Sequence, residues 1–125
     1  MQNMMGQDMW SDKDCAHWRR QIVDQYGLQA DITGLDGEFD LNAAVFVDGS
    51  FHAVLKVMRP DCTADFIEMQ IAALDHLAAQ KDHLPIPRCI LRVDGAAYGY
   101  LPDREGRDRL VWLVTALPGH QLGTV

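Results

Sequence analysis

A chain of 125 residues, of which 48% are hydrophobic and 23% charged, is long enough for one domain with its own core. Its net charge of −7 argues against a nucleic-acid partner, because binding phosphates requires a cationic surface. No apolar run approaches the roughly 20 residues that cross a bilayer, and the first residues lack the pattern of a secretory signal. Three scattered cysteines without a CxxC pair are typical of a reduced, cytoplasmic protein, and the scattered histidines predict no zinc site.

The start of the chain predicts a flexible stretch over residues 1–10, followed by a domain over residues 11–125 that opens with a helix. Ser11 or Asp14 is a suitable N-cap, since either side chain can accept the free amide protons of a first helical turn. Gly27 ends this helix, because glycine adopts the left-handed conformation of a helix C-terminus without strain. The apolar residues of the helix recur at spacings of three and four and share one face: Trp18, Ile22, Val23 and Tyr26.

Three strands are predicted next, over about residues 29–35, 41–47 and 51–57. Asp48-Gly49 between the second and third strands indicates a tight hairpin, because glycine takes a positive φ without steric cost. A short polar turn with one glycine separates the first two strands. The simplest topology for these three strands is an antiparallel meander.

A second helix is predicted over about residues 63–80. Thr63 is a suitable N-cap, and Asp65 lies in the first turn, where the helix dipole favours negative charge. The prolines of residues 84–87 cannot continue a helix and predict an extended connector. The side chains expected to face the core are Ile67, Ile71, Leu74, Leu77 and Ala78.

The last part of the chain predicts two or three further strands. Residues 88–93 end at a turn, Asp94-Gly95, with a return over residues 97–101, and residues 109–117 read as a strand buried on both faces. The predicted fold class is therefore α+β, an antiparallel sheet of about five strands with a packed helix and an N-terminal helix. The charged side chains around the last turn are expected to be solvated: Asp103, Arg104, Glu105, Arg107, Asp108 and Arg109.

Lys56 is the first candidate for a functional residue. It stands in an otherwise apolar strand, and because side chains alternate along a strand, it shares a face with Val54 and Met58. An ammonium group on an apolar face is costly unless it is paired, so we expect a partner or an anionic ligand there. The alternative is an edge-strand lysine that extends to water and protects the edge against aggregation.

Several short segments stand in the order and spacing of a kinase-like N-lobe, over roughly three-quarters of the chain. They are Tyr26-Gly27-Leu28, residues 35–42, Val54-Leu55-Lys56-Val57, Glu68-Met69-Gln70, residues 84–87 and residues 113–122. Together they resemble the N-lobe of the aminoglycoside phosphotransferase/choline kinase superfamily, which has a protein-kinase-like fold. The similarity is greatest to hydroxylysine-kinase-like phosphotransferase domains. No single segment is specific, and the resemblance depends on their order.

The resemblance implies an ATP site. Lys56 matches the lysine that contacts the α- and β-phosphates of the nucleotide. The segment from Gly37 to Asn42 matches the turn that covers the phosphates, with one glycine where protein kinases have three. Thr115, Ala116 and Leu117 match the hinge, whose backbone amide and carbonyl groups meet the edge of adenine.

The helix partner of Lys56 has two candidates, Glu68 and Gln70. On a helical wheel Gln70 lies with the apolar stripe, whereas Glu68 falls near the outer edge, so geometry favours Gln70. The hydroxylysine-kinase-like proteins also carry a glutamine there. A neutral amide can bond to Lys56 but cannot neutralise it, so phosphates or groups bound to Mg²⁺ would have to balance the charge. Alternatively, Glu68 is a solvated carboxylate and Gln70 is satisfied by the backbone.

Phosphoryl transfer also needs a catalytic aspartate and ligands for Mg²⁺. The resemblance places them in a helical C-lobe with an HxDxxxxN-type loop, which these 125 residues do not contain. We therefore expect the N-lobe of a small-molecule phosphotransferase, a fragment or a truncated reading frame, inactive alone and dependent on the C-lobe for Mg²⁺ and for the acceptor. The alternative is a stand-alone, non-catalytic module, whose exposed C-lobe-facing surface self-associates or binds a protein partner.

Overall fold

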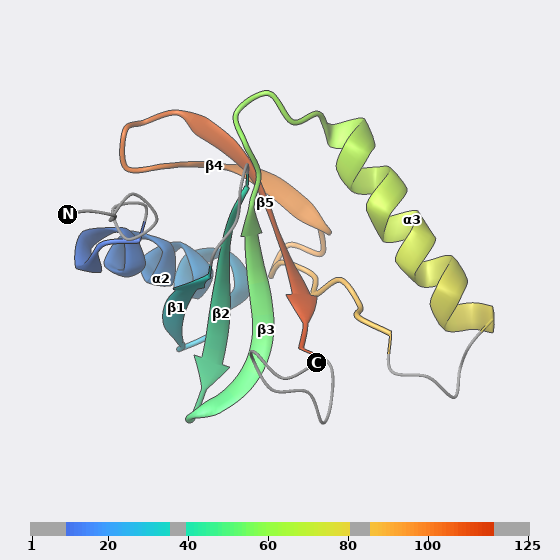
Figure 1. Cartoon of the computed structure of the whole chain (residues 1–125), viewed down its shortest axis with the longest axis horizontal. Coiled ribbons are helices and arrows are strands. Elements are labelled where there is room, and N and C mark those ends of the chain that lie inside the picture. Colours follow the sequence, from blue (N-terminus) through green and yellow to red (C-terminus); the bar gives the residue numbers. More distant parts are fainter. Residues whose placement is uncertain (1–9, 36–39, 81–85, 117–125) are drawn as a thin grey trace.

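The computed structural model describes residues 10–35, 40–80 and 86–116, which form one sheet and two helices (Figure 1). The predicted flexible stretch lies almost entirely outside these residues. The described elements agree closely with most of the predicted ones. They are α2 (Asp12–Tyr26), β1 (Asp31–Leu35), β2 (Leu41–Val47), β3 (Ser50–Val57), α3 (Ala64–Gln80), β4 (Tyr98–Pro102) and β5 (Asp108–Thr115).

The five strands form a single antiparallel sheet in the order β1-β2-β3-β5-β4. The meander of the first three strands is confirmed, and its second turn has the predicted chemistry. Asp48 and Gly49 both have positive φ, 54° and 81°, as the tightest hairpin turns require. The segment that contains α3 connects β3 to β4, so β5 is inserted between these two strands in the sheet (Figure 1).

Helix α2 begins and ends as its sequence predicts. Ser11 and Asp14 form a capping box, in which each side chain bonds to the backbone of the other residue. Gly27 is in the left-handed conformation with a φ of 70°, and its N–H donates to the carbonyl of Val23 at 3.0 Å. The helix buries Trp18, Ile22 and Tyr26, three of the four side chains assigned to its apolar face.

The two helices pack with opposite faces of the sheet. Because side chains alternate along β3, Leu55 and Val57 join the core that contains α2, whereas Val54 and Met58 join the cluster that contains α3. Helix α3 is the less buried of the two helices, since Ile67 is its one fully buried residue. Leu77, predicted to face the core, is 44% exposed, so the predicted buried stripe is only partly correct.

The predicted strand over residues 88–93 is wrong. Cys89 makes a single bridge to Val114, on the edge of β5 that β4 leaves uncovered beyond Trp112. The chain then leaves the sheet, because the N–H of Val93 donates to the carbonyl of Gln25 at the end of α2. The turn at Asp94-Gly95 is correct, but the strand that follows it, β4, pairs with β5.

The fold is therefore α+β, an open five-stranded antiparallel sheet with a packed helix and an N-terminal helix. It matches the architecture of a kinase-like N-lobe that the sequence predicts. Among the described residues, neither helix has the length and apolar character needed to span a bilayer.

Candidate functional site

Lys56 lies in a row of directly paired residues that crosses four strands of the sheet. It pairs with Asn42 on β2 and with Trp112 on β5, and Trp112 pairs in turn with Tyr98 on β4. Residues paired directly across an antiparallel sheet point to the same side. Asn42, Lys56, Trp112 and Tyr98 therefore share the face covered by α3, and Lys56 is neither on an edge strand nor on the outer side of the sheet.

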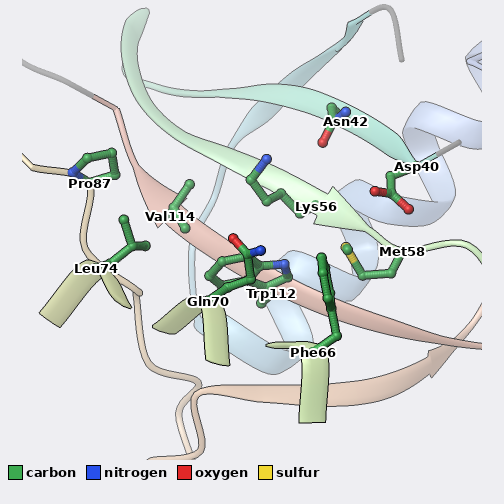
Figure 2. A pocket seen from close by; sticks show the side chains of 10 residues that line it. All are labelled: Asp40, Asn42, Lys56, Met58, Phe66, Gln70, Leu74, Pro87, Trp112 and Val114. Carbon is green, nitrogen blue, oxygen red and sulfur yellow. The ribbon is translucent and has the colours of Figure 1, made fainter. Parts of the chain in front are cut away.

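A groove of about 300 Å³ lies between this face of the sheet and α3 (Figure 2). Lys56 forms part of its strand side and Gln70 part of its helix side. Most of the lining is apolar, and the polar side chains come from different elements, as in many ligand sites. The residues that line the groove are Asp40, Asn42, Lys56, Met58, Phe66, Gln70, Leu74, Pro87, Trp112 and Val114.

Lys56 is half-buried as a residue, and its ammonium group has no hydrogen-bond or ion-pair partner among the described residues. Asp40 is the one carboxylate that lines the groove, and its Oδ1 accepts the backbone N–H of Arg59 at 3.0 Å. A cation beside apolar side chains is stabilised by an anionic ligand. Among its described lining residues, the groove therefore contains one cation and one carboxylate, and Lys56 is its candidate contact for an anion.

Of the two predicted helix partners, the structure brings Gln70 to the groove and Glu68 to another place. The Oε2 of Glu68 accepts a hydrogen bond of 2.5 Å from the Tyr98 hydroxyl, and this bond raises the pKa of the Tyr98 phenol. Gln70 lines the groove together with Lys56, although its residue is exposed as a whole. The helical wheel therefore gave the direction of Gln70 correctly and its burial wrongly.

The predicted phosphate-covering turn is described only at its end. Asn42 lies opposite Lys56 and lines the groove, whereas Gly37 lies outside the described residues. At the predicted hinge, the N–H of Thr115 donates to the carbonyl of Arg88 at 2.9 Å, and that of Ala116 to the carbonyl of His52 at 3.0 Å. Both amides are thus bonded within the chain. The predicted hinge role therefore falls to the carbonyls of Thr115 and Ala116 and to Leu117, which lies outside the described residues.

Arg88 connects α3 to the end of β5. Its backbone N–H donates to the Oγ1 of Thr115 at 3.0 Å, and its guanidinium forms an ion pair of 3.3 Å with Asp75 on α3. Both side chains of the ion pair are more than half exposed, at 56% and 58%. Such an exposed pair contributes little to stability. Arg88 is therefore held to β5 by its backbone bonds and to α3 only weakly, by its side chain.

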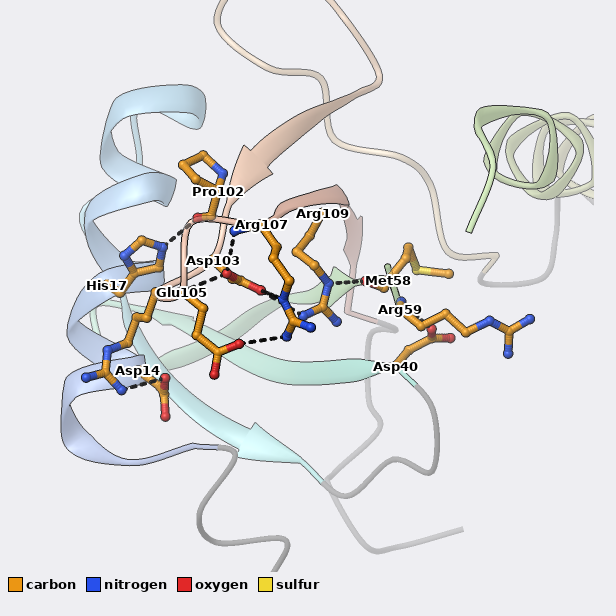
Figure 3. A network of polar contacts seen from close by, with 11 residues as sticks. Asp14, His17, Asp40, Met58, Arg59, Pro102, Asp103, Glu105, Arg107 and Arg109 are labelled. Atoms are coloured by element: carbon orange, nitrogen blue, oxygen red, sulfur yellow. Dashed lines mark hydrogen bonds and ion pairs between the residues drawn. The ribbon is translucent and has the colours of Figure 1, made fainter. Parts of the chain in front are cut away.

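Sequence reasoning missed the groove contact of Trp112 and the burial of Arg109. Trp112 is 3% exposed, as a strand buried on both faces predicts, and it also lines the groove beside Lys56. The register of β3 on β5 that places it there is a long-range pairing. Arg109, predicted to be solvated, is 6% exposed. Its Nε donates to the carbonyl of Met58 at 2.7 Å and its Nη1 pairs with Asp103 at 3.2 Å (Figure 3).

Asp103 is the centre of this second polar network, and its predicted solvation is also wrong, since its side chain is only 10% exposed. Burial opposes its ionisation, but the N–H groups of Arg107 and Glu105 and the guanidinium of Arg109 outweigh burial and lower the pKa of its carboxyl. The network closes the turn between β4 and β5 and lies outside the groove. We interpret it as structural.

No known family model matches the chain, and no curated protein is similar to it. Within the described residues, no group of three or more histidine, cysteine, aspartate or glutamate side chains could hold a metal ion. The functional interpretation therefore depends on the chemistry of the groove.

Proposed function

We propose that the chain is the nucleotide-binding N-lobe of an ATP-dependent small-molecule phosphotransferase of the aminoglycoside phosphotransferase/choline kinase type. The observation that carries the proposal is Lys56. Lys56 lines a groove of about 300 Å³ under a helix, and its ammonium group has no carboxylate partner among the described residues. A lysine placed in this way is suited to an anion with several oxygens, such as a triphosphate.

The arrangement of the elements supports the same function. A lysine on the third strand, a helix between the third and fourth strands and a final strand inserted between those two strands are the parts from which kinase N-lobes are built. In the proposal Lys56 binds phosphates, Gln70 positions Lys56, and the segment from Gly37 to Asn42 covers the nucleotide. The carbonyls of Thr115 and Ala116, with Leu117, meet the adenine edge.

The groove residues fit the phosphates of the nucleotide better than its metal ion. Lys56, Asn42 and Gln70 offer N–H donors, whereas Asp40 is the one carboxylate of the groove. Magnesium requires several oxygen ligands, so the proposal assigns Mg²⁺, the catalytic aspartate and the acceptor to a C-lobe. None of the five histidines of this chain is followed two residues later by an aspartate, as an HxDxxxxN loop requires.

Binding of a non-hydrolysable ATP analogue, measured by calorimetry, tests the proposal. We expect saturable binding by the full chain and its loss in Lys56→Ala, with unchanged circular dichroism, because Lys56 contributes to the groove and not to the fully buried core. Lys13→Ala, which removes an exposed lysine of α2, is the matched control and should bind normally. Equal affinity of Lys56→Ala and the unchanged chain would contradict the proposal.

A second candidate function, a non-catalytic interaction module, is favoured by one specific observation. Helix α3 exposes three large apolar side chains, Phe66 at 42%, Met69 at 61% and Leu77 at 44%. Exposed apolar groups on one element often mark a surface for another chain. A stable dimer in a solution mass measurement, together with no detectable binding of nucleotide, would favour this function over the first.

A further inference from the structure

The indole nitrogen of Trp112 is a buried donor without an acceptor. Trp112 is 3% exposed, and its Nε1 has no hydrogen-bond partner in the described part of the chain. An indole N–H can only donate, and a buried donor left unpaired loses its hydration without compensation. Trp10 Nε1, Tyr26 OH and Arg92 Nε are also unpartnered in the described part of the chain, but none of these residues lines the groove. Tyrosine and tryptophan polar atoms usually find a partner when buried, so the unpartnered donor of a groove residue is the candidate for a contact with a ligand.

The position of Trp112 shows where such a ligand would lie. Trp112 lines the groove and is the direct cross-strand neighbour of Lys56 on β5. In Figure 2 its indole nitrogen lies at the end of the ring nearer Phe66, next to the Gln70 amide in this view. Directly paired side chains are about 5 Å apart at Cβ, so one ligand group can reach both Lys56 and Trp112.

The chemistry of this pair selects the kind of ligand group. Lys56 and Trp112 are both pure donors, so the group between them must supply lone pairs and no proton of its own. The carboxylate nearest in sequence to Gln70, that of Glu68, is bonded to Tyr98 and does not line the groove. An ionised phosphate oxygen satisfies both donors, and a hydrogen bond to a charged acceptor is stronger than one between neutral groups.

We infer that Trp112 is a second phosphate-binding residue of the groove, which donates its indole N–H to an oxygen of the same anionic group that Lys56 holds. The inference rests on the proposed function, since the anion is the phosphate chain of the nucleotide. The indole N–H of Trp112 gives the site a buried donor in a fixed position beside the flexible ammonium group of Lys56. The site then selects its ligand by the position of the phosphate oxygens as well as by negative charge.

The indole resonances of the ¹⁵N-labelled full chain test the inference directly. Only three such signals exist, from Trp10, Trp18 and Trp112, and a Trp112→Phe sample identifies the relevant one. We expect MgATP and inorganic tripolyphosphate to move the Trp112 N–H signal downfield to saturation, while adenosine leaves it unchanged. The signal of Trp18, which packs with the opposite face of the sheet, is the internal control and should not move.

Affinity gives a second readout. We expect Trp112→Phe to weaken binding of MgATP by about tenfold, the effect of one hydrogen bond to a charged acceptor. Trp18→Phe is the matched control, which loses an equal ring area on the other face and should keep its affinity. Trp10→Phe and Trp18→Phe samples assign the Trp112 signal by elimination, so a poorly folded Trp112→Phe does not remove the spectral test.

The outcomes separate this inference from the proposed function. If Lys56→Ala abolishes MgATP binding while the Trp112 signal stays in place and Trp112→Phe binds normally, the inference is wrong and the proposed function stands. If adenosine moves the signal as far as tripolyphosphate does, Trp112 contacts the base, and the inference is again wrong. If the unchanged chain binds neither MgATP nor tripolyphosphate, both are wrong.

Discussion

The two faces of the sheet are built for different purposes. On the face covered by α2, Leu55, Val57 and Leu113 are fully buried, and α2 adds Trp18, Ile22 and Tyr26. On the face covered by α3, the same strands present Lys56 and Trp112 to a groove, and α3 contributes one fully buried residue. The α2 face has the larger buried cluster, whereas the α3 face combines a smaller one with Lys56 and the volume of the groove. The comparison indicates that stability comes mainly from the α2 face, and that the α3 face is available for a ligand.

Two neighbouring residues of β3 test this division most severely. Leu55→Ala removes a side chain with 0% exposure and should lower the free energy of unfolding by about 2–5 kcal/mol. Val54→Ala alters the other face, where the side chain is only partly buried, and should cost about 1 kcal/mol or less. Urea unfolding followed by circular dichroism measures both. Equal losses would show that the α3 face carries as much of the core as the α2 face.

The Arg109–Asp103 network gives a pH test of intermediate size. The folded state lowers the pKa of Asp103 below its ordinary value of 3.8, so its ionised form contributes stability above that pH. This contribution should be lost as the pH falls through 3.8 toward the lower folded pKa. We expect Asp103→Asn to destabilise by about 1–3 kcal/mol at pH 7, the usual cost of unpairing a buried charged partner.

The same variant should lose less stability than the unchanged chain between pH 5 and pH 3, since its side chain no longer titrates. Urea midpoints at several pH values measure the difference. Asp24→Asn, which removes a carboxylate at an exposed position on α2, is the control variant. Parallel profiles for Asp103→Asn and the unchanged chain would contradict the structural role that we assign to the network.

The variant with the smallest expected effect tests how α3 is attached to the sheet. Tyr98→Phe removes the exposed hydrogen bond to Glu68 and should have only a small effect on the free energy of unfolding. Its main consequence should be local, because this bond is one of the few polar links between α3 and the sheet in the described chain. Hydrogen exchange should become faster in the amides of α3 and stay the same in those of α2. Uniform acceleration in both helices would show that α3 unfolds only with the whole domain.

The sequence predicted what depends on near neighbours. The turn at Asp48-Gly49, the cap at Gly27 and the face of Lys56 all follow from residue type and from the period of a strand, and the structure agrees with each. The order of segments also predicted the sheet-and-helix architecture that surrounds the groove. Local chemistry was sufficient in these places because no distant contact competes with it.

The predictions failed where a contact between residues far apart in the sequence determines the structure. Residues 88–93 have the composition of a strand, but Val93 bonds to Gln25 at the end of α2 and draws the chain out of the sheet. Arg109 looks like a surface residue until the turn brings Asp103 and the carbonyl of Met58 to it. The position of Trp112 beside Lys56 depends on pairing between strands more than fifty residues apart, and no local pattern shows that register.

The exposed ion pair between Arg88 and Asp75 has a consequence for the motion of α3. The backbone of Arg88 is hydrogen-bonded to Thr115 at the end of β5. Its side chain is linked to α3 by an exposed ion pair, which salt would screen. Helix α3 packs against the sheet through Ile67, Ile71 and Leu74, so this ion pair can affect only the part of the helix beyond Leu74. Ionic strength should therefore change how freely that last part of the helix moves.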